Sequence, residues 1–118
     1  MSNVEKLKVR EQSVKLATEI YIQTKDRKDF WLSNQIQRSA VSISSNIAEW
    51  SDRETKKEYI RFLYIARWSC SELKTQITIA KNITYITDEK YIKLIQDIEN
   101  IHKMLNGLIN HLKIQIKS

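Results

Sequence analysis

Residues 55–81 read TKKEYIRFLYIARWSCSELKTQITIAK, and their apolar side chains recur at alternating steps of four and three residues. At about 3.6 residues per turn, this spacing places them along one side of a long α-helix, which must be buried against other helices. Thr55 and Glu58 can form a capping box at its start. The stretch therefore predicts one helix of a bundle. Its buried stripe comprises Tyr59, Leu63, Ala66, Cys70, Leu73, Ile77 and Ala80.

Composition restricts the fold class to all-α. The chain has 118 residues, no proline and one glycine, which disfavours the many tight turns of β-sandwiches and barrels. This length fits a single domain over residues 1–118 that needs no metal or disulfide. One cysteine and an N-terminus without an apolar signal segment predict a cytoplasmic protein. No run approaches the about 18 to 20 apolar residues that span a membrane, which excludes an integral membrane protein. Association with a membrane surface is the weaker alternative, because the apolar stripes are better explained by packing against each other, so no membrane partner is expected.

A first amphipathic helix is expected from Asn3 to about Lys25. Residues 26–31 lose the helical period and are interpreted as the first connection, with Phe30 and Trp31 closing one end of the bundle. The predicted buried stripe consists of Leu7, Val14, Ala17 and Tyr21, with Leu16 and Ile20 beside it.

A second helix is predicted to begin after Ser33, whose hydroxyl suits an N-cap, and to end in a charged turn over residues 51–54. Beside its buried stripe runs a face of small or polar side chains, which either exchange hydrogen bonds with another helix or face water. The buried stripe is Ile36, Ala40, Ile43, Ile47 and Trp50. The polar face is Gln35, Arg38, Ser39, Ser42, Asn46 and Glu49.

The polar, β-branched residues 82–87 interrupt the pattern, and Thr87 is the expected N-cap of a fourth helix. Gly107 lies inside this helix, which we expect to continue past it. Its apolar arc is too wide for one neighbour, so the helix is either central or part of a subunit interface. The first stripe is Tyr91, Leu94, Ile98, Ile101, Leu105, Leu108 and Leu112, and the second is Ile92, Ile95, Ile109 and Ile116.

Four long helices with short connections predict an antiparallel up-down-up-down four-helix bundle. Three sequence runs then resemble the family of 23S rRNA intervening-sequence proteins, which includes the accessory proteins of diversity-generating retroelements. The runs are SNQIQRSAVSISSNIAE at 33–49, KEYIRFLYIA at 57–66 and SCSELKTQ at 69–76. The chain departs from the family at Ser44, where proline is common, and at Trp50, where glycine is common.

This resemblance implies a small bacterial four-helix bundle that forms a ring, typically a pentamer, and has no enzymatic activity. In the retroelement branch, the resemblance implies a basic ring that binds nucleic acid and a reverse transcriptase. We therefore expect a nonenzymatic homo-oligomer. The alternative is a basic accessory protein that binds RNA or DNA and partners a reverse transcriptase.

The outer face of the third helix is the main candidate site. The chain carries a net charge of +6 and a sequence pI near 9.5, which fits a nucleic-acid partner but is also common in soluble proteins. Cations there can contact phosphates while aromatics stack on bases. The candidate nucleic-acid residues are Lys57, Arg61, Tyr64, Arg67, Trp68 and Lys74.

The same aromatic residues could instead form a subunit interface edged by charges, or remain exposed. On the second helix, the polar side chains could form a network between helices or subunits, or be solvated. The candidate interface or network residues are Arg38, Ser42, Asn46, Glu49, Ile60, Tyr64, Trp68 and Ile109.

Catalytic and metal chemistry finds little support in the sequence. Glu99 and His102 form one Glu-x-x-His pair, whereas di-iron bundles use two such pairs and two further glutamates, so a surface histidine is expected. Cys70 lies on the buried stripe, where a thiol acts as an apolar filler. One glycine excludes a glycine-rich phosphate loop. We predict no enzyme, no cofactor and no metal.

Overall fold

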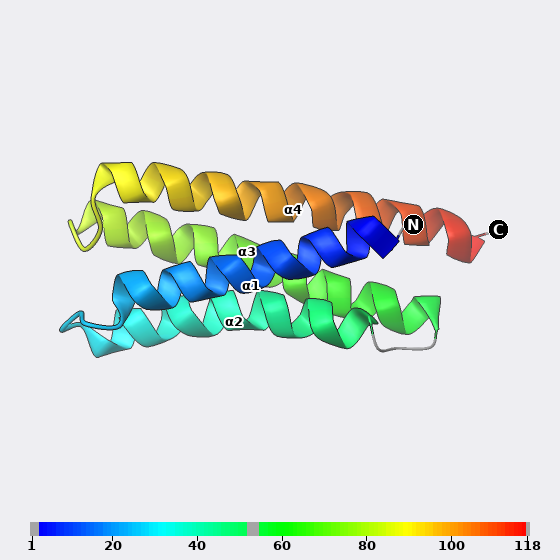
Figure 1. Cartoon of the computed structure of the whole chain (residues 1–118), viewed down its shortest axis with the longest axis horizontal. Helices are drawn as coiled ribbons and strands as arrows, with labels where there is room; N and C mark the ends of the chain where they lie inside the picture. The colour runs from blue at the N-terminus through cyan, green and yellow to red at the C-terminus, as the bar shows by residue number, and fades with distance from the viewer. Residues whose placement is uncertain (1–2, 52–54, 118) are drawn as a thin grey trace.

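The computed structural model describes residues 3–51 and 55–117 and contains four α-helices (Figure 1). They are α1 (Asn3–Thr24), α2 (Phe30–Ser51), α3 (Lys56–Asn82) and α4 (Asp88–Lys117). Successive helices run antiparallel, with the α1–α2 and α3–α4 connections at one end of the bundle (Figure 1). The bundle measures 50 × 21 × 21 Å. The predicted all-α, up-down-up-down architecture is confirmed.

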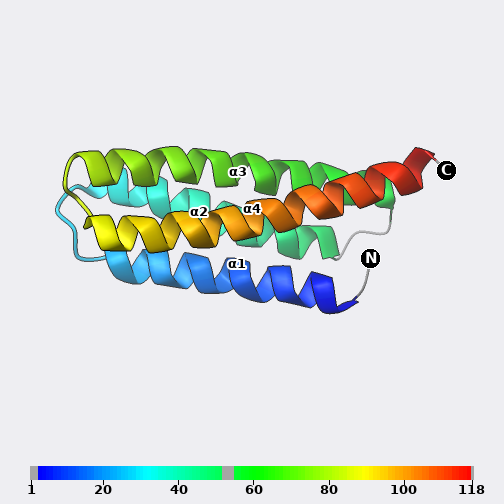
Figure 2. The same ribbon diagram turned by 90° about the horizontal axis from the view of Figure 1, so that it is seen from above.

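The helices form a four-sided arrangement in which each packs against two neighbours (Figures 1 and 2). The most extensive contact joins α2 to α3, followed by the contacts of α3 with α4 and of α1 with α2. Contact between α1 and α4 is the sparsest of the four. The seam between α1 and α4 is therefore the most open side of the bundle.

The predicted stripes of α2, α3 and α4 form the core. On α3, the stripe from Leu63 to Ala80 is buried and Tyr59 is half-buried, as predicted. On α4, the first stripe is buried from Leu94 to Leu112. α2 buries its whole predicted stripe, including Trp50, and the helix continues without a break through Ser44. Among the described residues, 23 buried apolar side chains form one cluster that joins all four helices.

The buried face of α1 differs from the prediction. Leu7, Val14 and Tyr21 are each more than half exposed, whereas the core side carries two polar residues among its apolar ones. These two, Ser13 and Thr24, are tolerated because their hydroxyls donate to carbonyls of their own helix, at 2.9 and 2.7 Å. The predicted stripe was therefore wrong for Leu7, Val14 and Tyr21, whereas Ala17 is half-buried against the core. The buried residues of α1 are Val9, Ser13, Leu16, Ile20 and Thr24.

The start of α2 also corrects two predictions. The Oδ1 atom of Asp29 accepts a hydrogen bond from the Leu32 amide at 3.1 Å, so Asp29, and not Ser33, caps the helix. Ser33 lies buried in the first turn, where its hydroxyl contacts that of Tyr85 from the α3–α4 connection. Phe30 and Trp31 are 73% and 72% exposed, so they do not close the bundle end.

The other helix ends follow the sequence closely. The Thr55 hydroxyl accepts from the Glu58 amide at 3.2 Å, and the Thr87 hydroxyl accepts from the Lys90 amide at 3.2 Å, which confirms both N-caps. Residues 83–87 separate α3 from α4, as predicted. Helix α4 continues through Gly107, where an added Cβ would meet nothing within 4 Å. The charged turn was expected over residues 51–54; Ser51 is instead the last residue of α2, and residues 52–54 lie outside the described residues.

Candidate interaction surfaces

Four of the candidate residues on α3 point away from the bundle. Lys57, Arg61, Tyr64 and Trp68 follow one another at steps of four, three and four residues, opposite the buried Leu63 stripe. The two cations are exposed, and Trp68 is 69% exposed. This outer face of α3 therefore offers charge and an aromatic ring to the same partner.

Tyr64 occupies the boundary between this face and α4. Its ring centroid lies 5.0 Å from Cζ of Arg67 and 5.5 Å from Nζ of Lys113 on α4, within cation–π range of both. Nη1 of Arg67 also donates to Oδ1 of Asn106 on α4 at 3.1 Å. Arg67 is therefore tied to α4, and two cations lie over the ring of Tyr64.

Lys74 lies two turns further along α3, on the same side as Arg67. Burial is the main cause that lowers the pKa of His102 on α4, and the charges of Lys74 and Arg67 lower it further. Glu99 acts in the opposite direction and only partly offsets them. The α3–α4 side is thus a positively charged surface that continues the outer face of α3.

Trp68 instead lines a hollow on the other side of α3, facing α2. Ser39 and Ser69, which are almost fully buried, form part of its floor, and Arg38 and Glu72 contribute charged groups of opposite sign. The aromatic ring is thus placed beside the small residues of α2, separate from Arg67 and Lys74. The predicted nucleic-acid set therefore divides between two sides of α3.

Ser42 links the polar side of α2 to α3. The hydroxyls of Ser42 and Ser69 lie 2.9 Å apart, and Nδ2 of Asn46 donates to the carbonyl oxygen of Ser42 at 2.8 Å and to its hydroxyl at 3.2 Å. These contacts join Ser42 and Asn46 to α3 within one chain. Arg38 and Glu49 are exposed on the outer side of the same helix.

A second hollow lies between α1 and α2, and of its lining residues Arg38 and Ser42 were among the candidates, whereas the others were not. It is lined by Ala17 and Tyr21 from α1 and by Gln37, Arg38, Val41 and Ser42 from α2. Tyr21 and Val41 are 55% and 52% exposed. The seven-residue spacing of Leu7, Val14 and Tyr21 could have indicated this exposed side of α1, but the prediction places these residues in the core.

The isoleucine candidates are less accessible than expected. Ile109 is fully buried in the core of its own chain, because the arc of α4 is wide enough to pack against both neighbouring helices. Ile60 is half-buried against the core. Within the second stripe of α4, Ile92 is the most exposed member, at 64%. Ile109 is therefore a core residue and does not belong to the candidate interface.

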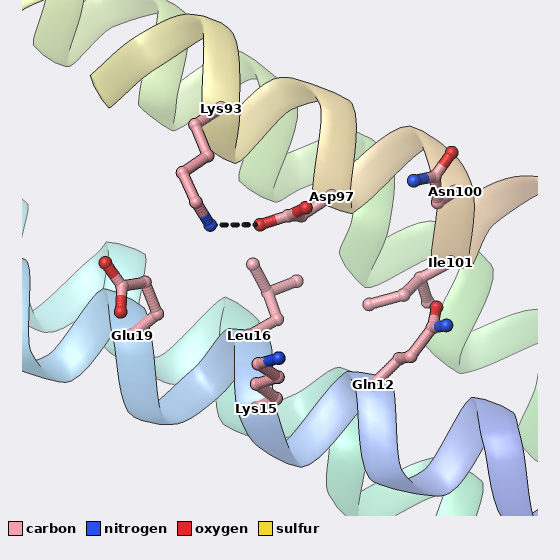
Figure 3. Close-up of a pocket in the computed structure, with 8 residues that line it drawn as sticks. All are labelled: Gln12, Lys15, Leu16, Glu19, Lys93, Asp97, Asn100 and Ile101. Atoms are coloured by element: carbon pink, nitrogen blue, oxygen red, sulfur yellow. Dashed lines mark hydrogen bonds and ion pairs between the residues drawn. The ribbon is translucent and has the colours of Figure 1, made fainter. Parts of the chain in front are cut away.

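A third hollow occupies the seam between α1 and α4 (Figure 3). Charged groups of both signs surround it, and Nζ of Lys93 pairs with Oδ2 of Asp97 at 3.2 Å across one turn of α4. Leu16 and Ile101 form its apolar floor. The side chains that line the hollow carry amides, carboxylates and amines, which suit polar contacts. No cysteine or histidine is among its lining residues. Its residues are Gln12, Lys15, Leu16, Glu19, Lys93, Asp97, Asn100 and Ile101.

Two further groups bear on chemistry. Burial raises the pKa of the Cys70 thiol to about 12, so this side chain stays protonated and acts as part of the core. Among residues 3–51 and 55–117, no three histidine, cysteine, aspartate or glutamate side chains are grouped so that they could hold a metal ion. The described helices also include none that is long and apolar enough to cross a membrane.

The architecture defines the class of protein, a four-helix bundle, and its surface carries exposed aromatic and cationic side chains. The chain belongs to the 23S rRNA-intervening sequence protein family, whose sequence profile matches residues 5–107. None of the curated proteins matches it in sequence. A crystal structure of a protein of unknown function, from the S23 ribosomal protein family of Bacteroides thetaiotaomicron VPI-5482, is 30% identical to it, with a TM-score of 0.83. That match covers 86% of this chain and 97% of the other.

Proposed function

We propose that this protein is a nonenzymatic, homo-oligomeric interaction module of the bacterial cytoplasm. The supporting observation is the number of large apolar side chains that the single chain leaves exposed. Trp31, Trp68, Tyr21 and Val41 are all more than half exposed. Scattered exposed apolar residues are ordinary, but aromatics grouped on adjacent helices are typical of protein interfaces. Following the family resemblance, the assembly is a ring, with five copies as the first number to test.

The inert chemistry of the described residues supports a nonenzymatic role. The buried Cys70 thiol, with its raised pKa, is a poor nucleophile. The hollow in Figure 3 holds charged groups but no histidine or cysteine that could transfer a proton or attack a substrate near neutral pH. A single reduced cysteine also suits a reducing compartment.

Gel filtration coupled to light scattering tests the assembly. One chain has a mass of 14.0 kDa, so a pentamer has five times that mass, about 70 kDa. Measurement across a hundredfold range of micromolar concentrations should give a mass that is a multiple of one chain. A clean single-chain mass at the highest concentration refutes the proposal. A stable multiple other than five refutes only the ring size.

A second function, nucleic-acid binding, is supported by the cations around Tyr64. Arg67 and Lys113 flank its ring, and Lys57 and Arg61 continue the positive surface along the exposed side of α3. In this function, the cations contact phosphates while the rings of Tyr64 and Trp68 stack on unpaired bases of RNA or DNA. A reverse transcriptase is the protein partner that the family resemblance suggests for this function.

Salt titration separates this function from simple basicity. Binding of labelled single-stranded RNA and DNA should weaken steeply between 50 and 200 mM salt, by about tenfold or more if several phosphates are contacted. The double variant Lys57→Gln/Arg61→Gln should reduce the slope of log K against log salt by about 1.5 to 2. Lys90→Gln, at an exposed position at the start of α4, is the control. Binding that is absent at 50 mM salt excludes this function.

A further inference from the structure

Helix α2 is almost without charge. Its 22 residues include two charged side chains, Arg38 and Glu49. The other helices have seven in 22 residues (α1), eight in 27 (α3) and nine in 30 (α4). A helix whose outer side faces water normally carries charged residues there, whereas the centres of interfaces are depleted of them. The outer side of α2 therefore has the composition of a covered surface.

This outer side lies opposite the core. Trp31, Arg38 and Ser45 follow at seven-residue intervals, so they share one stripe of α2, and all three are exposed. Val41 lies beside this stripe and is 52% exposed. We define the α2 face by Trp31, Arg38, Val41 and Ser45 of α2, together with Tyr21 of α1 and Trp68 of α3.

The shape of the α2 face suits a protein partner. The hollow between α1 and α2 and the hollow between α2 and α3 share Arg38 and Ser42, so the two flank α2 on either side. Tyr21 borders one hollow and Trp68 borders the other. Small serine side chains separate them, and small side chains let a second helix approach closely. The face thus combines projecting aromatic rings with recesses that could receive such rings.

We infer that the α2 face is the surface through which copies of this chain join, an inference that rests on the proposed homo-oligomer. With exposed fractions of 55%, 72% and 69%, the rings of Tyr21, Trp31 and Trp68 contribute about 400 Å² at about 200 Å² per aromatic side chain. This is about half of the ~800 Å² that each partner buries in a standard interface. A second copy brings both rings and recesses, as self-association requires.

The charges of the α2 face exclude the other classes of partner. Among its six residues there is one cation, Arg38, which is too few to hold a phosphate backbone, and the basic residues lie on α3 and α4 instead. A lipid surface is bound by an apolar side that cations flank, whereas serine and arginine occupy the centre of the α2 face. A neutral protein surface with its own aromatics is the remaining match.

Introducing a charge at Ser45 tests the inference. Ser45 is exposed on the outer stripe of the α2 face, and glutamate or lysine fits a helix at an exposed position, so Ser45→Glu and Ser45→Lys should keep the helical circular dichroism and urea midpoint of the wild type. A charge of either sign introduced into a surface that assembly covers should weaken association by at least tenfold, as measured by light scattering across a dilution series. Ser71→Glu, at an exposed position of α3 on the side away from α2, is the matched control.

The outcomes separate the inference from the proposed function. The inference is supported if the wild type is oligomeric and both Ser45 variants dissociate at a protein concentration ten times that at which the wild type dissociates. Ser71→Glu should dissociate at the wild-type concentration. Assembly of both variants at the wild-type concentration overturns it and leaves the proposed homo-oligomer standing. Equal dissociation of Ser71→Glu also overturns it, because the effect would then not depend on the α2 face. A monomeric wild type overturns the proposed function itself.

Discussion

The position of Ile109 gives the most direct test of the core. Its side chain is 0% exposed within a single chain, so Ile109→Ala should destabilise each subunit by itself. Three carbons are removed, and at about 0.8 kcal/mol for each buried carbon the lost transfer free energy is about 2.4 kcal/mol. The unfilled cavity adds to this, giving a decrease of about 3 kcal/mol in the free energy of unfolding.

Urea unfolding followed by far-ultraviolet circular dichroism measures this decrease, at two protein concentrations that differ twentyfold. Ile92→Ala is the control, because it makes the same change in the same helix at a side chain that is 64% exposed, and its effect should stay below about 0.5 kcal/mol. Concentration shifts the midpoints of an assembling protein, but the difference between Ile109→Ala and wild type should remain the same. A decrease in the free energy of unfolding below about 1 kcal/mol would refute the reasoning. A decrease that disappears on dilution would also refute it, because that behaviour is expected if Ile109 lies at a contact between subunits.

Three other predictions follow from local contacts. Thr55→Ala removes the N-cap hydroxyl that accepts from Glu58 and should cost about 1 kcal/mol by thermal unfolding, whereas Thr75→Ala, at an exposed position within α3, should cost less than half of that. Because folding raises the pKa of Cys70 from 9.0 to about 12, its contribution to stability is complete below pH 9 and lost between pH 9 and 12. The urea midpoint should thus fall more steeply above pH 9 for wild type than for Cys70→Ala, and parallel curves would contradict this. Lys74→Gln removes a charge that lowers the pKa of His102, so proton NMR should show this pKa rising, with Lys57→Gln as the unchanged control.

The buried sides of α2, α3 and α4 could be predicted because the core residues of each helix lie within one continuous apolar arc of its sequence. Helix α1 has two stripes, one with Leu16 and Ile20 and one with Leu7, Val14 and Tyr21. The stripe that becomes buried depends on the neighbouring helices and on whether Ser13 and Thr24 can bond to their own backbone. Helical periodicity reveals neither the positions of the neighbouring helices nor these hydrogen bonds. The sequence therefore did not predict that the stripe with Ser13 and Thr24 would be buried in the core.

The candidate surfaces were predictable only in part, for a related reason. Helical spacing separates Trp68 from Arg67 and Lys74 on the circumference of α3. The spacing does not state that α2 lies on the Trp68 side and α4 on the Arg67 side, because that depends on how the four helices are arranged around the core. The open seam between α1 and α4 in Figure 3 likewise arises from the packing of whole helices.

The distribution of charge lets the two proposed functions operate together, with Tyr64 as the ring left for bases, because assembly through the α2 face covers Trp68. The α2 face contains one cation, whereas Arg67 and Lys74 lie on the side of α3 that packs against α4. An assembly that covers the outer side of α2 therefore leaves the positive side of each subunit open. Closure of the ring would also repeat that positive side once per subunit, and binding to a long polyanion strengthens when several linked sites engage it at once. A variant such as Ser45→Glu, which separates the subunits without touching these cations, should consequently weaken binding to a long RNA more than binding to a short one.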